Sequence, residues 1–160
     1  MIHHHSRRRF LRVTSAAVLA GAVAGCTGDD DPDVDYEMED DVPEEIDEFL
    51  SAAQGYGGEI ADGTGEDEVT VVVGAGDGGL AYDPAALRVD AGTTVVFEWT
   101  GRGGSHNVVS TEESATEFES ELKSESGETF EWTFDDAGHQ FYVCTPHEQQ
   151  GMYGAIDVVD

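Results

Sequence analysis

The sequence is poor in basic residues. Lysine and arginine together number 7 against 35 aspartates and glutamates, which gives a formal net charge of −28 at pH 7. Four of the seven are arginines that precede residue 26, so residues 26–160 hold 3 basic residues against all 35 acidic ones. Without a basic stripe a protein cannot displace counterions from a phosphate backbone or bind anionic headgroups by charge. The charge therefore excludes nucleic acids as partners.

Cysteines and long apolar runs are also scarce. Two cysteines, Cys26 and Cys144, cannot support a disulfide-rich scaffold, and no apolar run reaches the roughly 20 residues that span a bilayer. A surface this acidic repels itself until salt of about 1 M shortens the Debye length to about 3 Å. The composition predicts a protein that works in concentrated salt, as in a halophile. An acidic tail on an ordinary domain is the weaker alternative, because acidic residues run through the whole chain.

The N-terminal residues resemble an export address followed by an anchor. Ser6–Arg12 is similar to the twin-arginine export motif, and the apolar stretch 13–25 is too short to span a membrane but fits a signal peptide. Val23–Cys26 resembles a lipobox, in which the chain is cut before the cysteine and the thiol is lipidated. We expect a signal peptide over 1–25, lipidation of Cys26, and a location on the extracytoplasmic face of the cell membrane. A basic N-terminus with an unrelated cysteine is the alternative.

An acidic segment follows the predicted anchor. Residues 29–48 contain 13 acidic residues in 20, together with Pro32 and Pro43. Such a segment buries too little apolar surface to become ordered. We therefore expect a disordered stalk over 26–43, which either lifts the domain off the membrane or only improves solubility.

A short helix is predicted after this stalk. Ile46, Phe49, Leu50 and Ala53 fall at helical spacing, between Pro43 and a glycine at 55. We expect a helix near 44–53 and a connecting loop up to residue 66.

From residue 67 the pattern indicates β-strands throughout. Apolar side chains alternate with polar ones in three stretches, and turn residues separate them from further candidate strands. The alternating stretches are 69–73, 95–99 and 130–134, and the further candidates are Leu87–Asp90, His106–Ser110, Gln140–Cys144 and Ala155–Val159. Short strands at this spacing predict an all-β, Greek-key β-sandwich over 67–160.

Three residues near the C-terminus and one further upstream have the chemistry of a metal site. Cys144, His147 and Met152 form a C-x2-H-x4-M pattern, and His106 lies 38 residues before the cysteine. A trigonal His₂Cys site with a weak axial methionine is the geometry of blue-copper electron-transfer centres. Zinc would favour another cysteine, histidine or carboxylate over the methionine. A binuclear copper site would need a second cysteine in the loop, and a cysteine nucleophile paired with His147 lacks a recognisable third partner.

Four stretches together resemble a known family. They are Asp83–Val89, Trp99–Gly101, His106–Val109 and Cys144–Met152. On these residues the segment from about 67 to 160 looks like a cupredoxin, the blue-copper family that includes plastocyanin and the halocyanins of halophilic archaea.

This resemblance implies a cupredoxin-like sandwich that holds one mononuclear type 1 copper ion. By the family pattern His106, Cys144 and His147 are the equatorial ligands and Met152 is the axial ligand. His139 lies five residues before Cys144 and is expected to point to the opposite face of its strand, away from the metal.

The resemblance also implies which residues support the ligands. In cupredoxins the residue after the first histidine ligand ties the two ligand loops together; here it is Asn107, with Thr145 as the expected partner. Pro146 has no N–H to donate to the Cys144 sulfur, although it serves equally to shape the turn. Plant plastocyanins carry an aromatic residue directly before the cysteine, where this chain has Val143. His147 is therefore the expected electron port.

These observations predict a one-electron carrier that is not an enzyme, because four ligands leave no open position for a substrate. The expected partners are membrane-bound respiratory components, with the carrier acting as a lipid-anchored monomer. A module that stores or delivers copper without redox cycling is the alternative. A copper oxidase or reductase subunit would need a second metal site, for which the sequence offers no second histidine cluster.

Overall fold

The computed structural model describes residues 32 and 34–160. The predicted signal peptide, Cys26 and the first part of the predicted stalk lie outside the described residues. Within the described part of the chain, no helix has the length and apolar character needed to cross a membrane.

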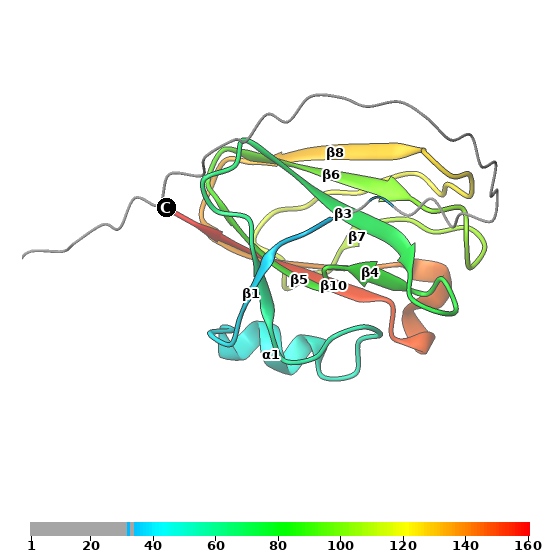
Figure 1. Ribbon diagram of the computed structural model, residues 1–160, viewed down its shortest axis with the longest axis horizontal. Coiled ribbons are helices and arrows are strands. Elements are labelled where there is room, and N and C mark those ends of the chain that lie inside the picture. Colours follow the sequence, from blue (N-terminus) through cyan, green and yellow to red (C-terminus); the bar gives the residue numbers. More distant parts are fainter. Residues whose placement is uncertain (1–31, 33) are drawn as a thin grey trace, which may run out of the picture.

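Two β-sheets pack face to face (Figure 1), which confirms the predicted β-sandwich. One sheet has the strand order β1-β2-β5-β10-β9-β7 and the other has the order β4-β3-β6-β8. The strands are β1 (Glu37–Glu39), β2 (Ile60–Asp62), β3 (Glu68–Ala75), β4 (Ala81–Asp83), β5 (Ala86–Asp90), β6 (Thr93–Trp99), β7 (Val109–Ser110), β8 (Thr129–Phe134), β9 (Gly138–Val143) and β10 (Tyr153–Val159). The helices are α1 (Glu44–Leu50) and the 3₁₀-helix η1 (Thr145–Gln150).

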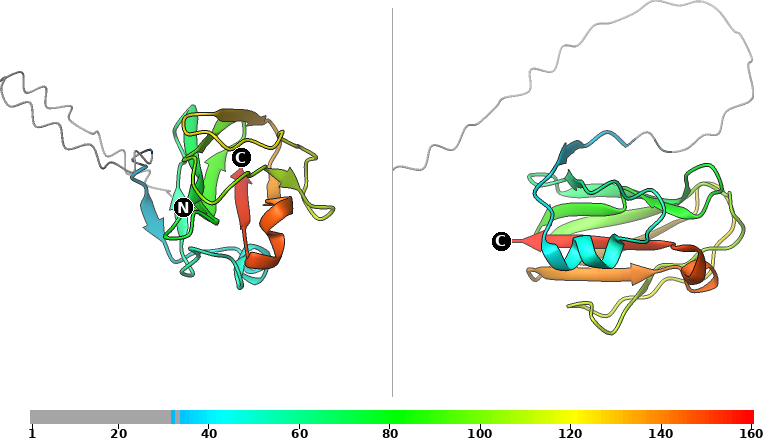
Figure 2. Two further views of the ribbon diagram at one scale, coloured as in Figure 1. Left: turned by 90° about the vertical axis from the view of Figure 1, so that its right-hand side faces the viewer. Right: turned by 90° about the horizontal axis from the view of Figure 1, so that it is seen from below.

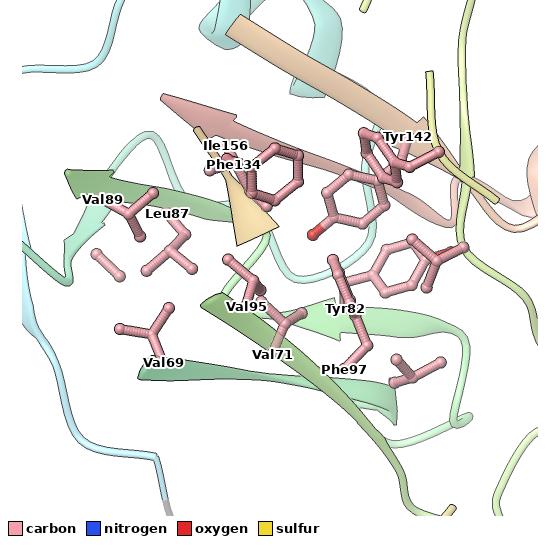
Figure 3. Close-up of a cluster of buried hydrophobic side chains, with 14 of the residues drawn as sticks. Val69, Val71, Tyr82, Leu87, Val89, Val95, Phe97, Phe134, Tyr142 and Ile156 are labelled. Carbon is pink, nitrogen blue, oxygen red and sulfur yellow. The ribbon is translucent and has the colours of Figure 1, made fainter. Parts of the chain in front are cut away.

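The main core lies between the two sheets. Figure 3 shows valines of β3 and β6 facing Leu87, Val89 and Ile156 across the sandwich. At the end nearer the ligand loop the core is aromatic: the ring of Tyr142 meets those of Tyr82 and Phe97 edge-on, with centroids 4.8 and 5.4 Å apart. Edge-to-face pairs at this distance add stability beyond their burial. The metal ligands therefore lie next to a closely packed aromatic part of the core.

The segment before residue 44 is more ordered than its composition predicts. Disorder was expected over 26–43, but residues 37–39 form β1, which pairs antiparallel with β2. The phenol of Tyr36 donates a hydrogen bond to the Thr70 carbonyl (2.8 Å), and Arg88 forms an ion pair with Glu39 (2.9 Å). One arginine and one half-buried tyrosine thus hold a segment whose acidic residues would otherwise keep it in solvent.

The predicted domain start at residue 67 is therefore too late. β2 joins the six-stranded sheet by parallel pairing with β5, so residues predicted to be loop belong to the sandwich. Helix α1 ends at Leu50, earlier than the predicted residue 53. It lies on the outer face of the six-stranded sheet, where Ile46 and Leu50 are fully buried against β9 and β10.

Candidate metal centre

The structure brings three of the predicted ligands together. The ligand atoms of His106, Cys144 and His147 all lie within 4.8 Å of one another. The two Nδ1 atoms are 3.1 Å apart, and the Cys144 Sγ lies 3.7 Å from Nδ1 of His106 and 3.4 Å from Nδ1 of His147. His106 and Cys144 are fully buried, whereas His147 is partly exposed. Two imidazoles and one thiol converging from three directions fit a single soft ion.

The ligand loop closes on itself between β9 and β10. The Cys144 N–H donates to the Met152 carbonyl (3.0 Å), the His147 N–H to the Cys144 carbonyl (3.1 Å), and the Met152 N–H to the His147 carbonyl (3.3 Å). Met152 is fully buried and belongs to the same core cluster as Cys144. These bonds place the methionine backbone directly beside the cysteine.

One ring nitrogen of His106 is occupied, which leaves the other for a metal. Nε2 lies 2.6 Å from the Arg102 carbonyl oxygen, an acceptor that requires Nε2 to carry the proton. The unprotonated Nδ1 then faces Cys144 and His147. The loop containing Arg102 lies close above the ring, since a Cβ on Gly103 would be only 2.9 Å from Nε2. A side chain at position 103 would push against the ligand.

Burial shifts the protonation equilibria of both buried ligands. It lowers the pKa of His106, which favours the neutral imidazole that binds metals, although the hydrogen bond to the Arg102 carbonyl opposes this shift. Burial also raises the pKa of the Cys144 thiol, against backbone hydrogen bonds from Asn107 and His147. A metal ion that binds the thiolate must therefore displace a proton from Cys144.

Two hydrogen bonds join the ligand loop to the segment that carries His106, which lies just before β7 rather than within the strand predicted over His106–Ser110. The Asn107 Nδ2 donates to Thr145 Oγ1 and the Thr145 N–H donates to Asn107 Oδ1, both at 2.9 Å. Asn107 is nearly buried, so both bonds are shielded on one side from water. Pro146 lies exposed in the first turn of η1 and has no N–H.

Sequence reasoning missed three supports of the His106 ring and of the backbone at His106 and Asn107. The Trp99 Nε1–H donates to the His106 carbonyl (3.1 Å), and the Tyr82 phenol donates to the Asn107 carbonyl (2.6 Å). The third is the Arg102 carbonyl. Trp99 falls in one of the alternating apolar stretches and Tyr82 does not, and nothing in the sequence distinguished the polar atom of either as a partner of the segment that carries His106.

His139 stands apart from the ligand cluster, as the sequence predicts. Its Nδ1 lies 2.8 Å from the Glu45 carboxylate and its Nε2 3.6 Å from that of Asp157. It links α1 to the outer face of β9 and β10 and takes no part in the metal site.

Comparison with known proteins places these ligands in a family. Residues 69–159 match the family described as copper binding proteins, plastocyanin/azurin family. The chain belongs to this family. Copper is accordingly its cofactor, as predicted, and the blue-copper proteins of this family are electron carriers rather than enzymes.

The relatives include proteins from archaea and plants. Halocyanin from Natronomonas pharaonis is 56% identical over 158 residues, which cover 96% of this chain and 97% of that protein. Chloroplastic plastocyanin from Pisum sativum is 38% identical over 99 residues, which cover 56% of this chain and 58% of that protein. Among solved structures, oxidized plastocyanin from Dryopteris crassirhizoma matches with a TM-score of 0.48 and 25% identity, over 56% of this chain and 99% of that one.

Proposed function

We propose that this chain is a one-electron carrier held on the extracytoplasmic face of the cell membrane by a lipid on Cys26. It would pass electrons between membrane-bound respiratory components. The observation that carries the electron-carrier role is the converging cluster of His106, Cys144 and His147, with Met152 buried in the same core cluster as Cys144. Bound copper supplies the one-electron couple, and the residues supply a fixed geometry around it.

His147 is the proposed electron port. His106, Cys144 and Met152 are fully buried, and His147 alone among these ligands reaches solvent. Tyr142, the aromatic nearest the cysteine in sequence, is also fully buried. The positions directly before Cys144 therefore offer a partner no exposed aromatic side chain, and docking would use the exposed Pro146 next to His147, with the exposed Glu148 on its other side.

Visible and electron paramagnetic resonance spectroscopy of the copper-loaded protein in high salt tests the electron-carrier assignment. We expect an intense thiolate-to-copper band that bleaches on reduction. Cys144→Ser removes the thiolate and should abolish the band. Cys26→Ser, which changes the other cysteine of the chain, should retain it. A colourless copper complex of the wild-type chain would contradict the proposal, and slow electron self-exchange with ready copper transfer would favour a storage role.

A second measurement tests the axial ligand. Met152→Gln replaces a thioether by an amide oxygen, which favours Cu(II), so copper should stay bound while the reduction potential falls. An unchanged potential would show that Met152 is not axial.

The anchor is tested by cell fractionation. Cys26→Ser should release the protein from membranes if a lipid on this thiol holds it there. Continued tight membrane association of the variant would point to an uncleaved apolar leader instead.

Docking should depend on short-range contact. In molar salt the Debye length is about 3 Å, so the acidic charge cannot guide encounter over a distance. Neutralising several acidic residues between Asp29 and Glu48 should leave stopped-flow electron transfer with the membrane partner nearly unchanged. A charge at Pro146 should slow transfer strongly while the copper spectrum stays intact. The opposite pattern would overturn this docking model.

A further inference from the structure

The turn that follows α1 contacts the last turn of the ligand loop. The Gln54 N–H donates to the Gly151 carbonyl (2.8 Å), and the Gln54 Nε2 donates to the Gln150 carbonyl (3.0 Å). Figure 2 shows this turn beside the 3₁₀-helix that carries His147. Two consecutive carbonyls of the ligand loop are thus held by one residue that lies almost a hundred positions earlier in the chain.

The two segments are also in close contact. Gly151 has a positive φ of 85°, and a Cβ at this position would lie 2.5 Å from the Ala52 carbonyl oxygen. The ligand loop therefore cannot move toward this turn without displacing it. Contact and hydrogen bonds together restrict the loop in both directions.

The restricted peptide units come directly before Met152. The Met152 N–H is itself bonded to the His147 carbonyl, so the backbone that carries the predicted axial ligand is fixed on both sides. We propose that residues 44–54, named here the brace, position Met152 over the copper ion, with Gln54 as the positioning residue. This inference rests on the axial role of Met152 in the proposed function.

The brace is itself firmly attached to the sandwich. Phe49 of α1 packs against Phe141 and Tyr153, with ring centroids 4.9 and 5.5 Å away. Tyr153 is the residue after Met152, and Phe141 lies three positions before Cys144 in the same outer cluster. The brace therefore contacts β9 and β10, the strands on both sides of the ligand loop, as well as the loop itself.

A weak axial bond gives this positioning its importance. The axial ligand tunes the potential of a blue-copper site through its identity and its distance, and a thioether bond to copper is too weak to fix the backbone unaided. Supporting residues around a metal site commonly control affinity and potential in this way. Removing the brace contacts should make the Met152 backbone more mobile and should weaken the binding of copper.

Gln54→Ala in the full copper-loaded chain tests the proposal in molar KCl. It removes the side-chain bond, so Cu(II) release to a chelator should become about threefold faster, the low end for one hydrogen bond because Gln54 is exposed. The reduction potential and the rhombic splitting of the resonance spectrum should shift with it. Ser51→Ala is the matched control, because it loses only a local bond to the Glu48 carbonyl at the end of α1.

A second pair of variants acts from the loop side. Gly151→Ala and Gly127→Ala place the same methyl at the same φ of 85°, but only the first meets the brace, since nothing lies within 4 Å of a Cβ at 127. Gly151→Ala should release copper about tenfold faster than Gly127→Ala, as expected when an extra methyl is forced into a packed contact. In the metal-free protein the Met152 amide should also exchange its hydrogen faster in Gly151→Ala.

These results separate the brace from the electron-carrier assignment. If Gln54→Ala and Gly151→Ala both match their controls in copper release, potential and amide exchange, the brace proposal is overturned. If those variants behave as expected, the proposal stands. The proposed function would instead be contradicted if the copper-loaded wild-type chain lacked the blue band, or if the reduction potential were unchanged in Met152→Gln.

Discussion

At the scale of single residues, the ligands are held through backbone atoms as much as through side chains. The Arg102 carbonyl sets the tautomer of His106, while Trp99 and Tyr82 hold the carbonyls of residues 106 and 107. The ligands themselves could be predicted because their side-chain types and order are specific. The carbonyl of Arg102 could not, because every residue has one and only the fold determines where it points.

The bonds between Asn107 and Thr145 should contribute measurably to stability. Asn107→Ala removes both bonds and should lower the free energy of unfolding by about 2 kcal/mol, at about 1 kcal/mol for each bond. Thr145→Ala removes only the bond to its hydroxyl and should cost about half as much. Urea unfolding of the copper-loaded protein in high salt would measure both, and equal losses would show that the Thr145 N–H bond contributes nothing.

The metal-free protein should lose stability as the pH falls below 6.5. Burial lowers the pKa of His106 below its ordinary value of 6.5 in the folded chain. As the pH falls, the unfolded chain therefore takes up a proton before the folded chain does. The stability of the folded state declines between pH 6.5 and the lower pKa that His106 has in the folded chain. Thermal unfolding of wild type and His106→Gln across this range should show a shallower decline in the variant; parallel curves would contradict this.

At the scale of elements, strand length decides what the sequence can predict. β3, β6 and β8 each contain several apolar–polar alternations and were found from the pattern. β1, β2 and β4 have three residues each, too few to show a period, and β1 is hidden in an acidic run. Gln54 was missed for a related reason: its role depends on how α1 packs against the outer face of the sheet.

Arg88 holds β1 to the rest of its sheet. Its guanidinium bonds Asp157 and Glu39 at 2.9 Å each and the Asp41 carbonyl at 2.8 Å, with the Asp157 side chain only 9% exposed. Arg88→Met leaves that carboxylate without its arginine partner and should cost about 3 kcal/mol of unfolding free energy.

The more exposed of the two ion pairs of Arg88, the pair with Glu39, provides the control. The Glu39 side chain is 43% exposed, so Glu39→Gln should cost under about 1 kcal/mol. Hydrogen exchange would show whether β1 detaches from β2 in Arg88→Met. Equal losses in the two variants would mean that burial of Asp157 is not what makes Arg88 important.

At the scale of the whole molecule, the net charge of −28 should make stability depend on salt. The free energy of unfolding should rise with KCl concentration. Most of the rise should come below about 1 M, because at that concentration the Debye length has already fallen to about 3 Å. Replacing the exposed Glu117, Glu119 and Glu121 by glutamine should flatten this dependence. Urea unfolding at several KCl concentrations would test it, and an unchanged slope in the triple variant would rule out self-repulsion as the cause.

The direction of β10 has a practical consequence. This strand leaves the ligand loop at Tyr153 and carries the chain to its C-terminus at the far end of the sandwich (Figure 1). A tag or surface linker attached after Asp160 would therefore hold the protein on a support with its copper-bearing end facing the solution. Immobilised in that orientation, the molecule would present His147 to soluble redox partners while the attachment chemistry stays behind it.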